Sequence, residues 1–468
     1  MSKSGEKKER KPTLRILWTV NLVPANAAAV LNMQNENLGG WVEAMAGALV
    51  VQSPVASRQS PEESGAETPD SAPDTVGAGS RPEDGIGSYK PIELAIACKC
   101  GPQQSFRKEI DGVTYYSLGY SSKTRQAELT ERCESILADF APDLVQIEGT
   151  EFPHAGAMLK AAKKAGIPTV VSLQGILQGY YPYQCGNLQI DEMMFSRSIK
   201  KISAAWILHL RKTRWYKKRM PAEAEVLRLA DHFIGRTFWD RAHSYAINPD
   251  AKYHSVNRIL RTPFYKKDWN INGIERHSIY VGNGYSALKG AHFVIEALPQ
   301  LIREYPDVKV YIAGTPAYRE NDRRPFYKKG YGLYLEKLVD DLGVADHVVF
   351  TGSLKADEVA DRLSRTHVYV LCSAIENSPN TLGEAMMIGT PSVAAYVGGV
   401  PDMAADGVEA LFYRNDDPAL LVWNIKRIFD DDSLAISLSE ASRKRASVTH
   451  DPARNAAALR AVYEEILK

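Results

Sequence analysis

The chain has 468 residues, of which 44% are hydrophobic, and this is enough apolar material for the cores of two ordinary globular domains. Its formal net charge of +1 provides no overall basic field, so composition gives no support for nucleic acid as a partner. No segment approaches the roughly 20 consecutive apolar residues that a transmembrane helix needs, so we expect a cytoplasmic protein or one that is peripheral on the inner face of a membrane.

The five cysteines are odd in number and lack the spacing of zinc ligands. This pattern indicates reduced thiols in the cytoplasm and predicts no metal site. The basic N-terminus precedes an apolar run at residues 14–20, as in a signal peptide. Because Arg15, Asn21 and Pro24 interrupt that run, we interpret it as a first buried strand instead.

Short β-branched runs alternate with helical patterns along the chain, which is typical of parallel sheets covered by helices. In the first half we predict strands near residues 14–20, 93–97, 143–147, 168–173 and 232–235, and helices near residues 41–50, 124–140 and 154–165. The second half repeats the scheme, with strands near residues 277–281, 308–313, 347–351, 367–372 and 391–395. The predicted fold class is α/β, with two doubly wound Rossmann-like domains that face each other across a cleft.

Breaks in this alternation divide the chain into domains. We assign residues 11–257 to an N-terminal domain and residues 258–448 to a C-terminal domain, and we expect residues 449–468 to form a helix that packs back on the N-terminal domain. Residues 52–90 are rich in Ser, Pro, Glu, Ala and Gly and cannot bury enough apolar surface to fold, so we predict a disordered insertion there.

Residues 195–220 combine many lysines and arginines with apolar residues and contain no acidic residue. Two interpretations stay open for this basic amphipathic helix. It lies on an anionic lipid surface or receives an anionic acceptor, or it is a solvated charged face above an ordinary core stripe.

The segment from Glu376 to Glu384 follows the predicted strand at residues 367–372 and opens a helix. Ser378 suits the N-cap, Pro379 suits the first helical position, and Gly389 ends the helix. Two carboxylates that accept hydrogen bonds from hydroxyls, beside free helix-start amides that bind phosphate, indicate a nucleotide-sugar pocket. An ordinary capped helix with two surface glutamates is the alternative.

Two further segments point to the same cleft. Gly39 and Gly40 open a helix after the first strand, where a backbone without side chains can approach a ligand closely. Lys289 follows a glycine-rich loop that begins at Gly282, and its ammonium could neutralise a diphosphate leaving group as a glycosidic bond breaks. A solvated lysine in a helix cap is the simpler interpretation of Lys289.

Together with residues 16–18, 39–41, 282–290 and 398–401, the run at residues 376–391 resembles the retaining GT-B glycosyltransferases of the family-4 type, which includes bacterial polysaccharide enzymes. The resemblance implies a hexosyltransferase that moves a sugar from a nucleotide-diphosphate donor to a hydroxyl acceptor with retention, in surface polysaccharide or glycolipid synthesis. It implies no bound metal and no permanently bound cofactor, because the nucleotide sugar is a co-substrate. The implied partners are that nucleotide sugar and a glycan or lipid-linked acceptor.

The resemblance also assigns roles to individual residues. It implies that Glu376 and Lys289 are catalytic, that Glu376 contacts the donor sugar and that Glu384 holds the ribose hydroxyls. The donor-binding set that it implies consists of Gly39, Gly40, Asn283, Asn380, Thr381, Leu382 and Glu384, with Lys289 and the amides of residues 380–382 on the diphosphate.

The chain departs from the family pattern at two positions. Asn283 stands where many members have an arginine, so one diphosphate cation is missing or comes from elsewhere. Gln174 stands where the family often places a histidine, which leaves hydrogen bonding as its contact with the sugar or acceptor. His154 is a substitute for that histidine, or a helix cap.

Three other functions are compatible with the pattern. Residues 282–287 fit a relaxed G-x-G-x-x-A dinucleotide fingerprint, but the strand at residues 308–313 lacks the acid that would hold the ribose. A nucleotide-sugar epimerase or phosphorylase would use the same architecture. A donor-binding or glycan-binding module without activity is the third alternative, and Asn283 and Gln174 keep it open.

Overall fold

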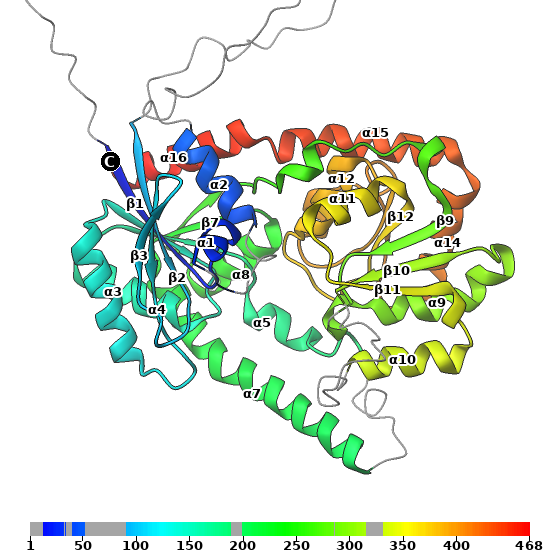
Figure 1. Ribbon diagram of the computed structural model, residues 1–468, viewed down its shortest axis with the longest axis horizontal. Coiled ribbons are helices and arrows are strands. Elements are labelled where there is room, and N and C mark those ends of the chain that lie inside the picture. Colours follow the sequence, from blue (N-terminus) through cyan, green and yellow to red (C-terminus); the bar gives the residue numbers. More distant parts are fainter. Residues whose placement is uncertain are drawn as a thin grey trace, which may run out of the picture.

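The computed structural model describes residues 13–31, 33, 40–51, 90–188, 199–284, 286–314 and 331–468, with the backbone alone at residues 51, 199–208 and 333. Gly39 and residues 52–89 lie outside the described residues, so the role of Gly39 and the insertion at residues 52–90 stay predictions. Figure 1 shows two sheets, each covered by helices, side by side. The predicted α/β class with two doubly wound domains is therefore confirmed.

The N-terminal sheet has eight strands in the order β3-β4-β2-β1-β5-β6-β7-β8 and is parallel except for the pair β3 and β4. Its strands are β1 Leu14–Val20, β2 Ile92–Cys98, β3 Arg107–Ile110, β4 Val113–Ser117, β5 Leu144–Glu148, β6 Thr169–Ser172, β7 His232–Gly235 and β8 Lys252–Ser255. Its helices are α1 Ala25–Val30, α2 Gly40–Val51, α3 Gln126–Phe140, α4 Pro153–Lys164, α5 Leu177–Tyr180, α7 Ile199–Leu229 and α8 Phe238–Ile247.

The central strand β1 shows why the apolar run near the N-terminus forms a strand. Ile16 and Trp18 pack into the core on one face of the sheet, whereas Leu17 packs into the core on the other face. A strand that is buried on both faces needs a continuous apolar run, and this is the pattern of a parallel sheet wrapped on both sides.

The sequence analysis missed the β3-β4 hairpin. Three of the four residues of β3 are exposed, so this edge strand lacks a buried apolar run. The turn carries the signal that could have found it, because Asp111 and Gly112 both have positive φ, at 51° and 75°. An Asp-Gly pair between two short runs is a strong hairpin signal.

The C-terminal sheet is parallel and has six strands in the order β11-β10-β9-β12-β13-β14. Its strands are β9 Glu275–Val281, β10 Lys309–Ala313, β11 Val348–Gly352, β12 Thr366–Leu371, β13 Ser392–Ala395 and β14 Leu411–Tyr413. Its helices are α9 Ala291–Glu304, α10 Tyr331–Leu342, α11 Ala356–Arg365, α12 Asn380–Ile388, α13 Val400–Met403, α14 Pro418–Asp430 and α15 Asp432–Thr449, followed by α16 Pro452–Ile466.

The last two helices, α15 and α16, run along one side of both domains (Figure 1). Residues of α16 belong to the same core cluster as Ile16 and Trp18. Tyr463 is fully buried there, and its hydroxyl accepts a hydrogen bond from Trp18 Nε1 at 2.9 Å and donates one to Gln146 Oε1 at 2.6 Å. The end of the chain is thus fixed in the N-terminal core. No helix in the described part of the chain combines the length and apolar character needed to cross a bilayer.

Removal of the Tyr463 hydroxyl tests how firmly α16 is fixed. Tyr463→Phe leaves the buried Trp18 N–H without an acceptor, so we expect the free energy of unfolding in urea to fall by about 1–3 kcal/mol. Tyr245→Phe is the matched control, because Tyr245 is 66% exposed and its change should stay within about 0.5 kcal/mol. Equal stability of the two variants would show that α16 does not depend on this contact.

Candidate functional site

A cavity of about 410 Å³ lies between the two domains, at the carboxyl ends of the C-terminal strands. From the N-terminal domain, Gly40 and Trp41 of α2 line it. The C-terminal side contributes residues from five segments, namely Arg261, Gly282, Asn283, Gly314, Ser353, Asn380, Thr381 and Glu384. A smaller cavity of about 40 Å³ shares Gly282, Asn283, Tyr369 and Thr381 with the first and adds Lys289, Ser373 and Glu376. We call the two together the crevice.

Helix α12 presents its N-terminus to the crevice. It begins at Asn380 with Pro379 as the N-cap, so the predicted start at Pro379 is wrong by one residue, and Ser378 is not the cap. The N–H of Leu382 already donates to the Pro379 carbonyl at 3.1 Å. The amides of Asn380 and Thr381 are therefore the ones that this helix end offers to an anion.

Glu376 lies in the loop after β12 and is only 5% exposed. Its Oε1 accepts hydrogen bonds from Lys289 Nζ at 2.5 Å and from Ser373 Oγ at 2.7 Å. Two glycines allow this close approach. A Cβ at Gly290 would lie 1.8 Å from the Cys372 carbonyl, and a Cβ at Gly398 would lie 1.9 Å from the Glu376 carbonyl, and both have positive φ.

Glu384 is 3% exposed and pairs with Arg261, whose Nε and Nη2 lie 2.9 and 2.8 Å from Oε1. Burial raises the pKa of Glu384 to about 7, although the positive charge of Arg261 acts in the opposite direction. Arg261 lines the crevice, as Asn283 does, and so brings a guanidinium to it. The sequence analysis did not assign this residue, because the loop between the domains has no periodic pattern.

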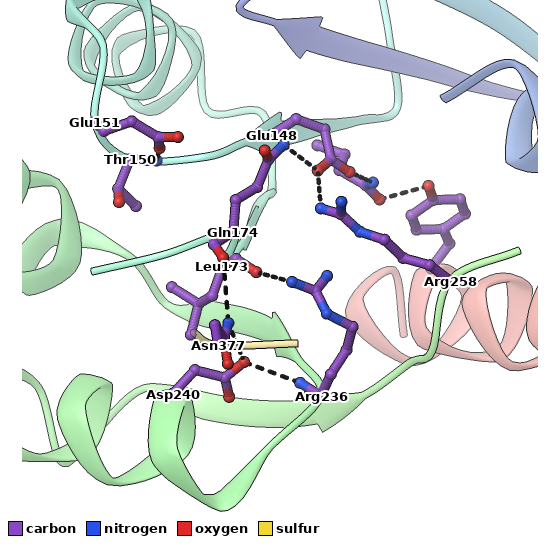
Figure 2. Close-up of polar contacts among 11 residues, drawn as sticks. Glu148, Thr150, Glu151, Leu173, Gln174, Arg236, Asp240, Arg258 and Asn377 are labelled. Carbon is purple, nitrogen blue, oxygen red and sulfur yellow. Dashed lines mark hydrogen bonds and ion pairs between the residues drawn. The ribbon is translucent and has the colours of Figure 1, made fainter. Parts of the chain in front are cut away.

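Asn377 joins the Glu376 loop to the N-terminal domain (Figure 2). Its side chain is 1% exposed, accepts from Thr237 Oγ1 at 2.6 Å, and donates to Asp240 Oδ2 at 2.9 Å and to the Gln174 carbonyl at 3.3 Å. Its backbone N–H donates to the Tyr180 hydroxyl at 2.9 Å. The residue next to Glu376 is thus fixed by four groups of the other domain. Sequence reasoning missed Asn377, although it stands inside the motif.

Gln174 lies at this domain boundary, where its Nε2 donates to Glu148 Oε2 at 3.3 Å. Glu148 also lies 4.0 Å from Arg258, and burial lowers the pKa of that guanidinium to about 9, with Arg236 adding to the effect. Figure 2 shows Arg236 directed at the Leu173 carbonyl, which it reaches at 2.8 Å. Gln174 therefore lies beside Asn377, which donates to its backbone carbonyl.

The structure does not bring His154 to the crevice. Its ring is fully buried in α4, and Nδ1 lies 2.9 Å from the Tyr120 hydroxyl. Burial lowers the pKa of His154 to about 3, and the charges of Lys99 and Arg219 lower it further. Over the described ranges, no group of three or more His, Cys, Asp or Glu is arranged to hold a metal ion.

Asn377→Ala tests the domain contact. The substitution removes the acceptor of the buried Thr237 hydroxyl and one of the donors to the buried Asp240, so the free energy of unfolding in urea should fall by about 1–3 kcal/mol. The exposed Asn272→Ala is the control and should change stability by less than about 0.5 kcal/mol. A neutral Asn377→Ala would mean that the two domains do not depend on this network.

Comparison with known families gives a match in the second half of the chain. Residues 262–445 match the family described as Glycosyl transferases group 1. This match contains Lys289, Glu376 and Glu384, but not Arg261, which lies immediately before it.

Curated relatives match over a part of their length. The chain is 29% identical over 166 residues to a D-inositol 3-phosphate glycosyltransferase of Corynebacterium urealyticum, which covers 34% of this chain and 36% of the relative. It is 28% identical over 162 residues to a GDP-mannose-dependent phosphatidylinositol monomannoside mannosyltransferase of Mycolicibacterium smegmatis, covering 33% of this chain and 39% of the relative. The chain thus spans well under half the length of these two relatives.

Solved structures match almost the whole chain. Sucrose-phosphate synthase of Thermosynechococcus elongatus superimposes with a TM-score of 0.65 and 15% identity, over 97% of this chain and 99% of that one. Anabaena HepE in complex with UDP-glucose gives a TM-score of 0.62 and 14% identity, over 97% of this chain and 100% of that one. The chain has the GT-B fold of these proteins.

Proposed function

We propose that this chain, with its Glycosyl transferases group 1 domain and its GT-B fold, moves a sugar from a nucleotide-diphosphate donor to an acceptor hydroxyl with retention. One observation carries the proposal. The crevice brings together two buried carboxylates, each paired with a cation, and the start of α12. Carboxylates that accept hydrogen bonds from sugar hydroxyls, together with amides and cations that bind phosphate, suit a nucleotide sugar.

The donor is proposed to lie across the crevice with its diphosphate at the amides of Asn380 and Thr381 and at Lys289. Both contacts of Glu384 with Arg261 use Oε1, which leaves Oε2 for the ribose hydroxyls in the described part of the chain. Arg261 supplies a positive charge near the diphosphate, next to the position where Asn283 replaces an arginine. The Arg261 side chain packs against Gly40, where an added Cβ would lie only 2.9 Å from it. The N-terminal domain therefore closes that end of the crevice.

Glu376 is proposed to bind the donor sugar. Its Oε1 is already shared by Lys289 and Ser373, and its Oε2 is directed to no other described group, so this oxygen is available to a sugar hydroxyl. Because Lys289 is held by Glu376, the ammonium has a fixed position before the donor binds. A cation that is fixed in advance stabilises a charge without reorganisation.

The proposed reaction needs little acid or base help from the protein. Negative charge builds on the diphosphate as the bond from the anomeric carbon to oxygen breaks, and Lys289 and the α12 amides stabilise that charge. If the acceptor hydroxyl approaches from the face that the nucleotide leaves, the departing phosphate oxygen accepts its proton, and configuration is retained. The protein then acts by orientation and charge stabilisation.

A role in surface polysaccharide or glycolipid synthesis at the inner face of a membrane extends this proposal. In support, α7 projects from the body of the molecule (Figure 1), and its described part exposes Arg214, Trp215, Lys217 and Lys218. Basic residues with an exposed aromatic side chain suit an anionic lipid surface. An epimerase or phosphorylase on this fold would consume the donor without any acceptor, and a binding module would not consume it.

The raised pKa of Glu384 makes donor affinity depend on pH. Ribose hydroxyls donate to the ionised carboxylate, so UDP-glucose should bind the ionised form of Glu384 more tightly. The pKa of Glu384 in the protein without ligand is about 7. The Kd for UDP-glucose should therefore be constant above pH 7 and rise by up to about tenfold per pH unit below it. Calorimetry on Glu384→Gln provides the control, since that variant should bind weakly with no such slope. A parent protein with a flat profile contradicts this role.

Lys289→Gln tests the leaving-group cation. We expect the release of UDP from UDP-glucose, with water as the acceptor, to slow by about 100-fold to 1,000-fold, while the Kd for UDP-glucose changes by less than about tenfold. Lys337→Gln is the matched control, because Lys337 is paired with Asp341 in α10 and lines neither cavity of the crevice. The proposal fails if both variants release UDP at the parent rate.

A further inference from the structure

Two cations share one aromatic ring at the carboxyl edge of the N-terminal sheet. Lys99 directly follows β2, and its Nζ lies 5.2 Å from the centre of the Phe152 ring. Arg219 comes from α7, and its Cζ lies 4.9 Å from the same centre. Tyr120 flanks Lys99 at 5.6 Å, and Trp215 flanks Arg219 at 4.3 Å. The result is a small cluster of two cations and three rings, which we call the cation pair.

The cation pair forms no ion pair with a carboxylate of the described residues. Within the described ranges, no carboxylate oxygen lies within 4.0 Å of either Lys99 or Arg219. Arg219 donates to the backbone carbonyl of Glu151 at 2.9 Å, while the carboxylate of Glu151 accepts from the Thr150 N–H at 2.7 Å. In the crevice, by contrast, each cation is paired with a glutamate.

Both members of the cation pair are only partly solvated, and this makes their proximity costly. Burial lowers the pKa of Lys99, and the charge of Arg219 lowers it further. Burial also lowers the pKa of Arg219, although the charge of Glu151 acts in the opposite direction. Two positive charges that are partly removed from water and lie near each other are stabilised by a bound anion.

Tyr180 and Glu151 connect the cation pair to the Glu376 loop. The Tyr180 hydroxyl accepts from the Asn377 N–H at 2.9 Å, so Tyr180 touches that loop. Burial raises the pKa of Tyr180 well above its usual range, and the charges of Glu376 and Glu151 raise it further, so both carboxylates are close enough to act on this hydroxyl. Arg219 in turn donates to the carbonyl of Glu151.

We infer that Lys99 and Arg219 bind a phosphate group of the acceptor. This inference rests on the proposed glycosyl transfer and names the class of its acceptor as a phosphorylated molecule. An arginine fork binds two phosphate oxygens at once and a lysine adds a point charge, so the pair suits a phosphate. The Trp215 ring lies beside Arg219 and is 37% exposed, so it is accessible to the rest of the acceptor.

His154 contacts two of the rings in this cluster. It is fully buried, stacks on Phe152 at 6.2 Å between ring centres, and orients Tyr120 through the contact at Nδ1. Since it stays neutral, it adds no third charge to the cation pair. His154, which the sequence analysis suggested as a sugar contact, thus packs behind the rings of the proposed acceptor site.

Amine labelling of Lys99, followed by mass spectrometry, tests the inference on the full chain. The probes are inorganic phosphate, glycerol 3-phosphate, and phosphatidylcholine vesicles with or without phosphatidylglycerol. At about ten times its Kd, a phosphate probe should slow the labelling of Lys99 roughly tenfold, and glycerol should not. Protection by glycerol 3-phosphate indicates a soluble acceptor, whereas protection by phosphatidylglycerol vesicles alone indicates a lipid-borne phosphate, and both outcomes support the inference.

Variants separate the charge from the fold. Arg219→Gln should abolish the protection, Arg219→Lys should retain part of it, and Arg228→Gln, an exposed change near the end of the same helix, should retain all of it. Protection by no phosphate probe, or equal protection in Arg219→Gln and Arg228→Gln, overturns the inference. Protection of Lys99 by UDP-glucose as strong as that by glycerol 3-phosphate also overturns it, because the pair would then belong to the donor site.

A separate calorimetric titration with UDP-glucose distinguishes this inference from the proposed function. If UDP-glucose binds and Lys99 stays unprotected by phosphate, the acceptor inference alone fails. If phosphate protects Lys99 but no nucleotide sugar binds or reacts, the glycosyl transfer that the inference rests on fails, and with it the assignment of this phosphate to an acceptor.

Discussion

The ion pair of Lys289 with Glu376 is the interaction on which the rest of the site depends. The Glu376 carboxylate is only 5% exposed, and Lys289 and Ser373 supply the cation and the hydrogen-bond donor that offset its removal from water. The same contact fixes the ammonium above the loop that leads into α12. Glu384 and Arg261 repeat this arrangement at the other end of the crevice. Each of the two carboxylates binds its cation through Oε1, so its Oε2 is left for a ligand.

The contact between the domains also fixes the position of Glu376. Asn377 forms four hydrogen bonds with the N-terminal domain, one as acceptor and three as donor, and they fix the position of its neighbour Glu376 relative to that domain. Gly399 reinforces this loop, because its N–H donates to the Glu376 carbonyl at 3.0 Å. A donor in the crevice would meet side chains whose positions are set before it binds, which is the condition for charge stabilisation without reorganisation.

Much of the fold could be predicted from the sequence, because the parallel strands are buried on both faces and appear as apolar runs. The two glutamates and Lys289 could be assigned to one crevice as well, because they lie in the loops that follow β12 and β9 or in the helix that begins after β12. Arg261 could not, because it lies in an aperiodic loop and reaches Glu384 only through the fold. Lys99 and Arg219 are 120 positions apart in number and meet only at the Phe152 ring, so no local pattern could connect them.

Amide hydrogen exchange with and without a nucleoside diphosphate tests the central claim most directly. If the diphosphate lies at the start of α12 beside Lys289, UDP should slow exchange at Asn380 and Thr381 and in the loop before Lys289. The N-terminus of α3, which lies in the other domain, should exchange at an unchanged rate. Unchanged exchange at Asn380 and Thr381 under saturating UDP, or protection confined to other helix starts, would contradict the account.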